Sequence, residues 1–108
     1  MTDDSTLGGY LRVHSRAPAF EGSDGSAYSV AVYVDEDPGP DGSYGGALVF
    51  VRWNAGGDQP EGHCETEYLA RGQSVKEVEE HVHALTLHQV KEALDQAIQR
   101  ARERPAWE

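Results

Sequence analysis

Alternating hydrophobic and polar positions through the middle of the chain predict two β-strands. In residues 27 to 36, one face of an extended chain carries β-branched and aromatic side chains, which strands favour. These side chains are Tyr28, Val30, Val32 and Val34. Residues 44 to 53 are apolar on both faces, with Ala47, Val49, Val51 and Trp53 on one and Leu48 and Phe50 on the other. A strand that is apolar on both faces is expected at the centre of a sheet.

Two further segments alternate and predict a first and a fourth strand. Residues 9 to 17 place Leu11 and Val13 on one face, and residues 63 to 71 show a weaker alternation typical of an edge strand. The connecting segments are rich in Gly, Pro, Asp and Asn, which adopt turn conformations readily. Successive strands joined by such turns predict an antiparallel meander.

From residue 74 the hydrophobic period changes to that of a helix. Ser74 and Glu77 form a capping-box pattern, in which each side chain accepts a hydrogen bond from a backbone amide at the helix start. The apolar stripe that follows has the three-four spacing of one helix face. It consists of Val75, Val78, Val82 and Leu85.

The apolar stripe loses its phase after Leu85, where a second capping box joins Thr86 to Gln89. Restarting a helix there aligns a second stripe on one face. That stripe consists of Leu87, Val90, Leu94, Ala97, Ile98 and Ala101. Two helices joined at about Leu85 to Thr86 are therefore predicted, with one kinked helix as the alternative.

These elements predict an α+β fold. An antiparallel four-stranded meander sheet is followed by two C-terminal helices packed on it, in the order ββββαα, as a two-layer sandwich. The predicted organisation is a flexible N-terminal tail over residues 1–8, a single domain over residues 9–104 and a C-terminal tail over residues 105–108.

Charge and cysteine content narrow the classes of partner. The 108 residues include 19 acidic and 9 basic side chains, giving a formal charge of −10 that repels phosphate backbones and anionic membranes. The sequence therefore predicts no nucleic-acid partner and no membrane association. No long apolar run or leader pattern is present, which predicts a cytoplasmic location. Cys64 is the single cysteine, so packing rather than an internal disulfide holds the fold.

Three of the five histidines lie within the segment HVHALTLH, residues 81 to 88. On the predicted helices His81 lies beside the first apolar stripe, His83 points to the solvent-facing side and His88 enters the second helix. They are interpreted as joint and surface residues, without metal or cofactor. The alternative is a metal site formed by His81, His88 and Glu77, although their spacing matches no helical zinc motif.

No complete catalytic motif is present. His63 and Cys64 are neighbours on a predicted strand and point to opposite faces, so they cannot pair directly as base and nucleophile. The acidic loop at residues 35–43 lacks the glycine and closing glutamate of an EF-hand, since Pro40 and Gly46 occupy those positions. These observations favour a non-enzymatic protein over an enzyme.

The apolar second face of the central strands predicts a surface for another chain. Two helices on one face leave a patch larger than soluble monomers usually expose. Either one helix crosses each face of the sheet, or another chain covers the second face, and the second alternative is favoured. The partner is a second copy of the chain, forming a homodimer, or a basic protein. The expected contact residues are Tyr33, Trp53, Trp107, Asp35, Glu36 and Asp37. The leading hypothesis is thus a small acidic binding or regulatory module acting through protein–protein contacts.

The alternative function is a small enzyme or a metal- or ligand-binding domain. Its pocket would lie between the sheet and the helices, near His81, His88 and Cys64. A cleft in which these side chains converge would favour this alternative over the binding module.

A strand followed by GQSVKEVEEHV resembles the strand, Gly-x-Ser/Thr and helix segment of HicB-type antitoxins. The resemblance spans about residues 65 to 85, without the Pro-Gly-Cys stretch typical of the preceding strand in that family. Proteins of this type are small, acidic and cytoplasmic, and they cover a basic ribonuclease. The resemblance implies a non-enzymatic module with a protein partner.

Overall fold

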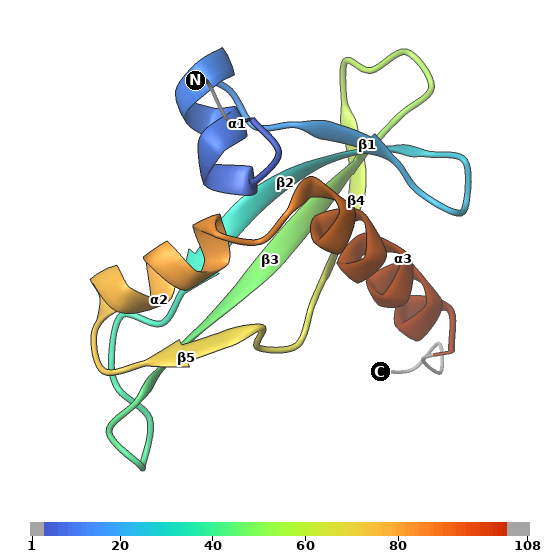
Figure 1. The fold of residues 1–108 in the computed structure, drawn as a ribbon. Coiled ribbons are helices and arrows are strands. Elements are labelled where there is room, and N and C mark those ends of the chain that lie inside the picture. The colour runs from blue at the N-terminus through green and yellow to red at the C-terminus, as the bar shows by residue number, and fades with distance from the viewer. Residues whose placement is uncertain (1–3, 104–108) are drawn as a thin grey trace.

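The computed structural model describes residues 4–103, which form an α+β fold (Figure 1). This confirms the predicted fold class, although a helix precedes the sheet. The elements in chain order are α1 (Leu7–His14), β1 (Ala19–Glu21), β2 (Ala27–Val34), β3 (Tyr44–Trp53), β4 (Pro60–Glu65), β5 (Ala70–Gly72), α2 (Val75–His83) and α3 (Leu87–Glu103).

The sheet is an antiparallel meander in the order β1-β2-β3-β4, with β5 pairing with the other end of β3. Strands β2 and β3 confirm the predictions for residues 27 to 36 and 44 to 53. Strand β3 is central as predicted, because it pairs with β2 along one edge and with both β4 and β5 along the other.

A bulge divides the predicted fourth strand, residues 63 to 71, into β4 and β5. Val49 pairs with Glu65 and Gly46 pairs with Ala70. An advance of three residues along β3 therefore corresponds to five residues between β4 and β5. The amide of Thr66 donates to the carbonyl of Leu48 at 3.0 Å, which keeps the bulge attached to the sheet. Such a bulge redirects side chains at the edge of a sheet.

The prediction of a strand at residues 9 to 17 is wrong, because α1 occupies most of that segment. Thr6 caps the helix by accepting from the amide of Gly9 at 3.0 Å, and Ser15 ends it with a φ of 57°. Leu7 is only 1% exposed, so the first turn of α1 belongs to the core and not to the predicted flexible tail at residues 1–8. The first strand is instead β1.

Tertiary contacts explain why a segment containing two adjacent glycines forms a helix. Glycine lowers helix propensity by about 1 kcal/mol relative to alanine. A Cβ atom on Gly8 would lie 2.8 Å from the Cβ atom of His83, so only glycine allows α1 to approach α2 this closely. The amide of Leu7 also donates to the carbonyl of Leu85 at 2.8 Å, which ties α1 to the end of α2.

The two predicted C-terminal helices are confirmed as α2 and α3. The hydroxyl of Ser74 accepts from the amide of Glu77 at 3.1 Å, while the Glu77 carboxylate accepts from the amide of Gln73. At the joint, Thr86 and Gln89 form the reciprocal capping box, with distances of 2.9 and 3.0 Å between amide nitrogen and side-chain oxygen. The chain therefore starts a new helix after Leu85.

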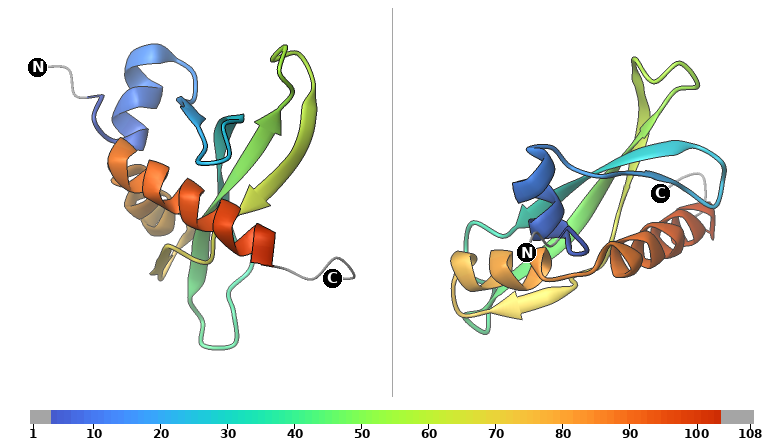
Figure 2. Two further views of the ribbon diagram at one scale, coloured as in Figure 1. Left: turned by 90° about the vertical axis from the view of Figure 1, so that its right-hand side faces the viewer. Right: turned by 45° about the horizontal axis from the view of Figure 1, so that its top comes forward.

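All three helices of residues 4–103 lie on the same side of the sheet (Figure 2). The core lies between the helices and this side. Its fully buried side chains come from every layer, namely Leu7 of α1, Leu48 and Phe50 of β3, Val78 and Val82 of α2, and Val90 and Leu94 of α3. Strand β3 therefore forms the central part of the sheet surface against which the core packs.

We expect Thr86→Ala to lower the free energy of unfolding by about 1 kcal/mol, because it removes the hydroxyl that caps α3. Thr86→Ser keeps a capping hydroxyl and should stay close to the wild type. Urea unfolding followed by circular dichroism measures both variants. Equal stability of Thr86→Ala and the wild type would contradict a helix start at this residue.

We expect Leu7→Ala to lower the free energy of unfolding by roughly 2–5 kcal/mol, because it leaves a cavity beneath α1. Val13→Ala is the matched control on the same helix. Val13 is 40% exposed, so its loss should change stability by no more than about 0.5 kcal/mol. If the two variants unfold alike, α1 does not contribute Leu7 to the core.

Candidate functional site

The side of the sheet turned away from the helices is called the open face here. Its apolar and aromatic side chains come from β2 and β3 and are Ala31, Tyr33, Ala47, Val49, Val51 and Trp53. No helix within residues 4–103 covers them (Figure 2). Tyr33 is 48% exposed, while Val49, Val51 and Trp53 are partly exposed. The open face is therefore a largely apolar side of the sheet that these helices leave uncovered, although Ala47 itself is buried.

Tyr33 and Trp53, two of the predicted contact residues, both lie on the open face, toward opposite ends of the β2–β3 pair. The indole Nε1 of Trp53 donates to the hydroxyl of Ser29 at 3.0 Å, which fixes the indole orientation on the sheet. A fixed aromatic ring loses little conformational entropy on binding, which favours its use as an anchor. Trp107 lies outside the described residues.

The predicted acidic residues lie where β2 leaves the sheet, and Asp35 has a structural role there. Its carboxylate accepts from the hydroxyl of Tyr68 at 2.8 Å and from the amide of Gly45 at 3.1 Å. The hydrogen bond from Tyr68 is the main cause that lowers the pKa of Asp35 below its usual value. Glu36 and Asp37 are exposed, so they are available at the rim of the open face.

Tyr68 and Arg71 also lie at this end of the open face, and the sequence analysis missed them. Tyr68 is 47% exposed, and the Arg71 guanidinium carbon lies 4.9 Å from the centre of its ring. A Cβ atom on Gly45 would lie 2.6 Å from the Tyr68 ring, so the glycine makes room for the tyrosine. The one signal in the sequence was the Gly45-Gly46 pair inside an apolar strand, which indicates close approach of another group.

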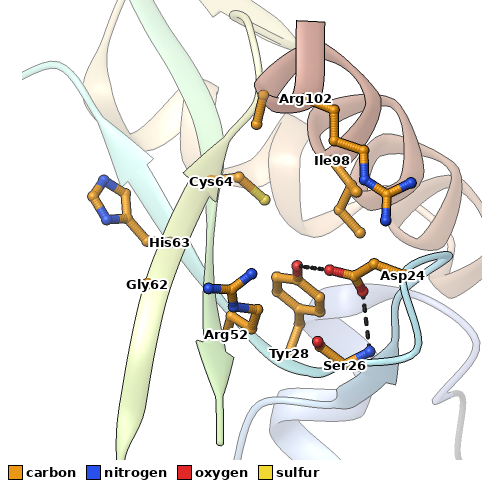
Figure 3. Close-up of a pocket in the computed structure, with 10 residues that line it drawn as sticks. Asp24, Ser26, Tyr28, Arg52, Gly62, His63, Cys64, Ile98 and Arg102 are labelled. Carbon is orange, nitrogen blue, oxygen red and sulfur yellow. Dashed lines mark hydrogen bonds between the residues drawn. The ribbon is translucent and has the colours of Figure 1, made fainter. Parts of the chain in front are cut away.

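A second candidate site lies on the helix-covered side, at the end of α3 (Figure 3). This hollow of about 460 Å³, called the arginine pocket here, contains two arginines beside polar and apolar groups. It is lined by Asp24, Ser26, Tyr28, Arg52, Gly62, His63, Cys64, Ile98, Ala101 and Arg102. Its volume falls within the range of roughly 300–1,000 Å³ seen for small-molecule sites.

Asp24 and Tyr28 form a hydrogen-bonded pair in the arginine pocket. The Tyr28 hydroxyl donates to the Asp24 carboxylate at 2.7 Å, and the amide of Ser26 donates to the other carboxylate oxygen at 3.0 Å. Burial and the neighbouring Asp24 raise the pKa of Tyr28 to about 12. Burial opposes ionisation of Asp24, but these hydrogen bonds and Arg102 outweigh it and lower its pKa. The pair is therefore an ionised acceptor beside a neutral phenol.

His63 and Cys64 point to opposite faces of β4, as the sequence predicted. His63 pairs with Val51 on the open-face side, and Cys64 pairs with Phe50 on the core side. Figure 3 shows the imidazole turned away from the sulfur. Burial, followed by the nearby Asp24 charge, raises the pKa of the Cys64 thiol. A thiol with a raised pKa is mostly protonated at neutral pH and is a poor nucleophile.

The predicted alternative site at His81, His88 and Glu77 is not assembled. His88 pairs with Glu92 at 2.8 Å on the outer side of α3, and Glu77 accepts from the amide of Gln73. His81 is exposed on α2, away from the arginine pocket, so only Cys64 of the predicted pocket residues lines that hollow. Within residues 4–103, no three His, Cys, Asp or Glu side chains lie close enough to hold a metal ion.

The position predicted for His83 is wrong, because His83 is half-buried. Its side chain packs against Gly8 of α1 instead of facing open solvent. The missed helix α1 explains the difference, since it covers the side of α2 on which His83 lies.

Comparison of the chain with protein-family models, with curated proteins and with solved structures gave no match in any of the three. The likeness to HicB-type antitoxins thus stays limited to the pattern of residues 65 to 85. None of the helices within residues 4–103 has the length and apolar content that a membrane crossing requires.

We expect Tyr28→Phe to reduce the loss of stability between pH 10 and pH 12. The pKa of Tyr28 is raised from 10.0 to about 12 in the folded protein, so its stabilising effect is complete below pH 10 and disappears by about pH 12. Urea unfolding of the wild type and the variant at several pH values measures the difference. A difference that stays constant across this range would contradict the raised pKa of Tyr28.

Proposed function

We propose that the protein is a non-enzymatic binding module whose open face docks another protein chain. The observation that carries the proposal is the placement of all three helices of residues 4–103 on one side of the sheet. This placement leaves Tyr33, Val49 and Trp53 without cover from these helices. Apolar side chains with fixed aromatic anchors and a polar rim are typical of protein interfaces. A cytoplasmic location is part of the proposal, because one cysteine suits a reducing compartment.

The charge around the open face favours a basic partner over a second copy of the chain. Glu21 lies in the same cross-strand row as Trp53, and Glu65 lies opposite Val49. Glu36 and Asp37 extend this acidic border beyond β2. Two copies docked through the same face would bring these borders together at a charge of −10 each, whereas a basic rim would complement them.

The alternative, an enzyme with a pocket near Cys64, has weaker support. The thiol of Cys64 is half-buried, its pKa is raised, and His63 points to the other side of the strand. Nucleophilic catalysis needs a base within hydrogen-bond distance of the nucleophile or a thiol with a lowered pKa. Neither condition is met at Cys64 by the described residues.

Site-specific photo-crosslinking in cells of the source organism tests the proposal. A photoreactive amino acid at Tyr33 or Val51 should give an adduct with one basic protein, identified by mass spectrometry. The same amino acid at Gln96, which is exposed on α3, is the matched control and should not give that adduct. Adducts only with a second copy of the chain, or equal adducts from Gln96, would overturn the proposal of a basic partner on the open face.

Once the partner is purified, binding kinetics should separate the rim from the anchors. Reversing Glu36 and Asp37 to lysine should slow association several-fold at low salt and less at high salt, because rim charges guide the encounter. Trp53→Ala should accelerate dissociation by at least about tenfold, because it removes a buried aromatic anchor. Surface plasmon resonance at several salt concentrations measures both rates.

A charge-matched control and a second anchor variant complete this kinetic experiment. Reversing Glu80 and Glu92 to lysine makes the same change in net charge on exposed helix positions, and it should affect association less. Tyr33→Ala provides a second anchor variant at an exposed position, should Trp53→Ala fail to fold. Equal and salt-independent effects of rim and anchor variants would contradict this division.

A further inference from the structure

The arginine pocket has a charge pattern opposite to that of the whole chain. The protein carries a formal charge of −10, yet Arg52 of β3 and Arg102 of α3 line the same hollow (Figure 3). Within residues 4–103, neither guanidinium forms a salt bridge with a carboxylate. The planar donor fork of arginine matches the oxygens of a carboxylate or a phosphate. Two such groups at one hollow indicate an anion-binding capacity.

Arg52 has a buried donor that its own chain does not satisfy. Its Nε is inaccessible to solvent and has no hydrogen-bond partner among the described residues. A donor that water cannot reach is closed to a ligand as well, so a ligand in the pocket can contact Arg52 only through its terminal guanidinium nitrogens. Gly62 lies beside Arg52 in the sheet, and a Cβ atom there would lie 3.5 Å from Nη2. The absence of a side chain at Gly62 keeps this side of the guanidinium accessible to a ligand.

The opposite wall presents a fixed acceptor and an apolar surface. The Asp24 carboxylate is held by the Ser26 amide and the Tyr28 hydroxyl, and each oxygen retains capacity for a further donor. The turn that carries Asp24 is attached to α3, because the amide of Ser23 donates to the Asp95 carboxylate at 3.0 Å. Ile98 and Ala101 supply the apolar lining. The pocket is therefore formed before any ligand binds.

We propose that the arginine pocket binds a small hydroxylated organic anion. The anionic group, a carboxylate or a phosphate, pairs with Arg52 and Arg102, while a hydroxyl of the same molecule donates to Asp24. Asp24 repels a plain anion, so the ligand must compensate by this hydroxyl, and Asp24 thereby sets specificity. The pocket lies on the helix-covered side of the sheet, and the inference does not rest on the proposed use of the open face.

Isothermal titration calorimetry of the full chain near neutral pH and at constant ionic strength tests this assignment. L-malate and glycerol 3-phosphate represent the carboxylate and phosphate ligands, succinate is malate without its hydroxyl, and glycerol lacks the anionic group. We expect saturable one-to-one binding of malate or glycerol 3-phosphate, with the tighter of the two identifying the head group. Succinate and glycerol should bind more weakly than their hydroxylated or anionic counterparts.

Three variants connect this binding to the named residues. Arg102→Ala, at an exposed position, should weaken binding by about tenfold or more, because it removes a charged donor pair. Arg100→Ala is the matched control on α3. The Arg100 guanidinium already donates to the carbonyl of Glu65 at 2.9 Å, so its loss should leave binding within about twofold. Asp24→Asn should tighten the binding of succinate and reduce the preference for malate.

The rate at which iodoacetamide alkylates Cys64 gives an independent readout. Cys64 is the single cysteine and lines the pocket, so a bound anion should slow its alkylation in the wild type but not in Arg102→Ala. Absence of saturable binding by both malate and glycerol 3-phosphate would overturn the proposal. Binding that is unaffected by Arg102→Ala, or succinate binding as tight as that of malate, would overturn it as well.

Discussion

The two-sided apolar character of β3 is the constraint on which the rest of the structure depends. Leu48 and Phe50 are fully buried beneath the helices, while Val49 and Val51 point to the other side of the same strand. Burying apolar area stabilises a protein by about 25 cal/mol per Å², so both sides of the strand favour cover. The helices of residues 4–103 cover only one of them.

The joint between α2 and α3 determines why the helices gather on one side. Helix α2 ends at the C-cap Ala84, and the capping box of Thr86 and Gln89 starts α3 directly afterwards, without a long loop. The backbone on both sides of the joint also holds the N-terminal segment. The amide of Leu7 donates to the carbonyl of Leu85, and the amide of Leu87 donates to the carbonyl of Ser5. Three helices are thereby fixed to one another over the core. This arrangement of the helices accounts for both sites. The open face is the side of the sheet that the helices leave uncovered, and the arginine pocket is a hollow at the far end of α3.

The sequence pattern correctly predicted those elements in which the local sequence signal and the tertiary packing favour the same structure. The valine row of β2, the apolar centre of β3 and the two capping boxes each have a local signal that the packing reinforces. Helix α1 was missed because Gly8 disfavours a helix locally, and only its contact with His83 explains it. The bulge between β4 and β5 depends on pairing with distant residues of β3, which no local period reveals.

Much the same distinction applies to the candidate sites. Tyr33 and Trp53 were predicted as open-face residues, because alternation along a strand determines which side chains share a face. Tyr68 follows from the bulge, and the arginine pocket joins the turn at Asp24 to β3 and the end of α3, segments far apart in the chain. Such sites require the tertiary fold and could not be predicted from spacing alone.

The central claim is that another chain covers the open face in the cell. Hydroxyl-radical footprinting of the purified protein and of the same protein in an extract of its source organism tests this most directly. We predict that oxidation of Tyr33 and Trp53, each measured relative to that of Tyr10 on α1, decreases in the extract. An unchanged ratio of Tyr33 and Trp53 oxidation to Tyr10 oxidation in the two samples would contradict the claim.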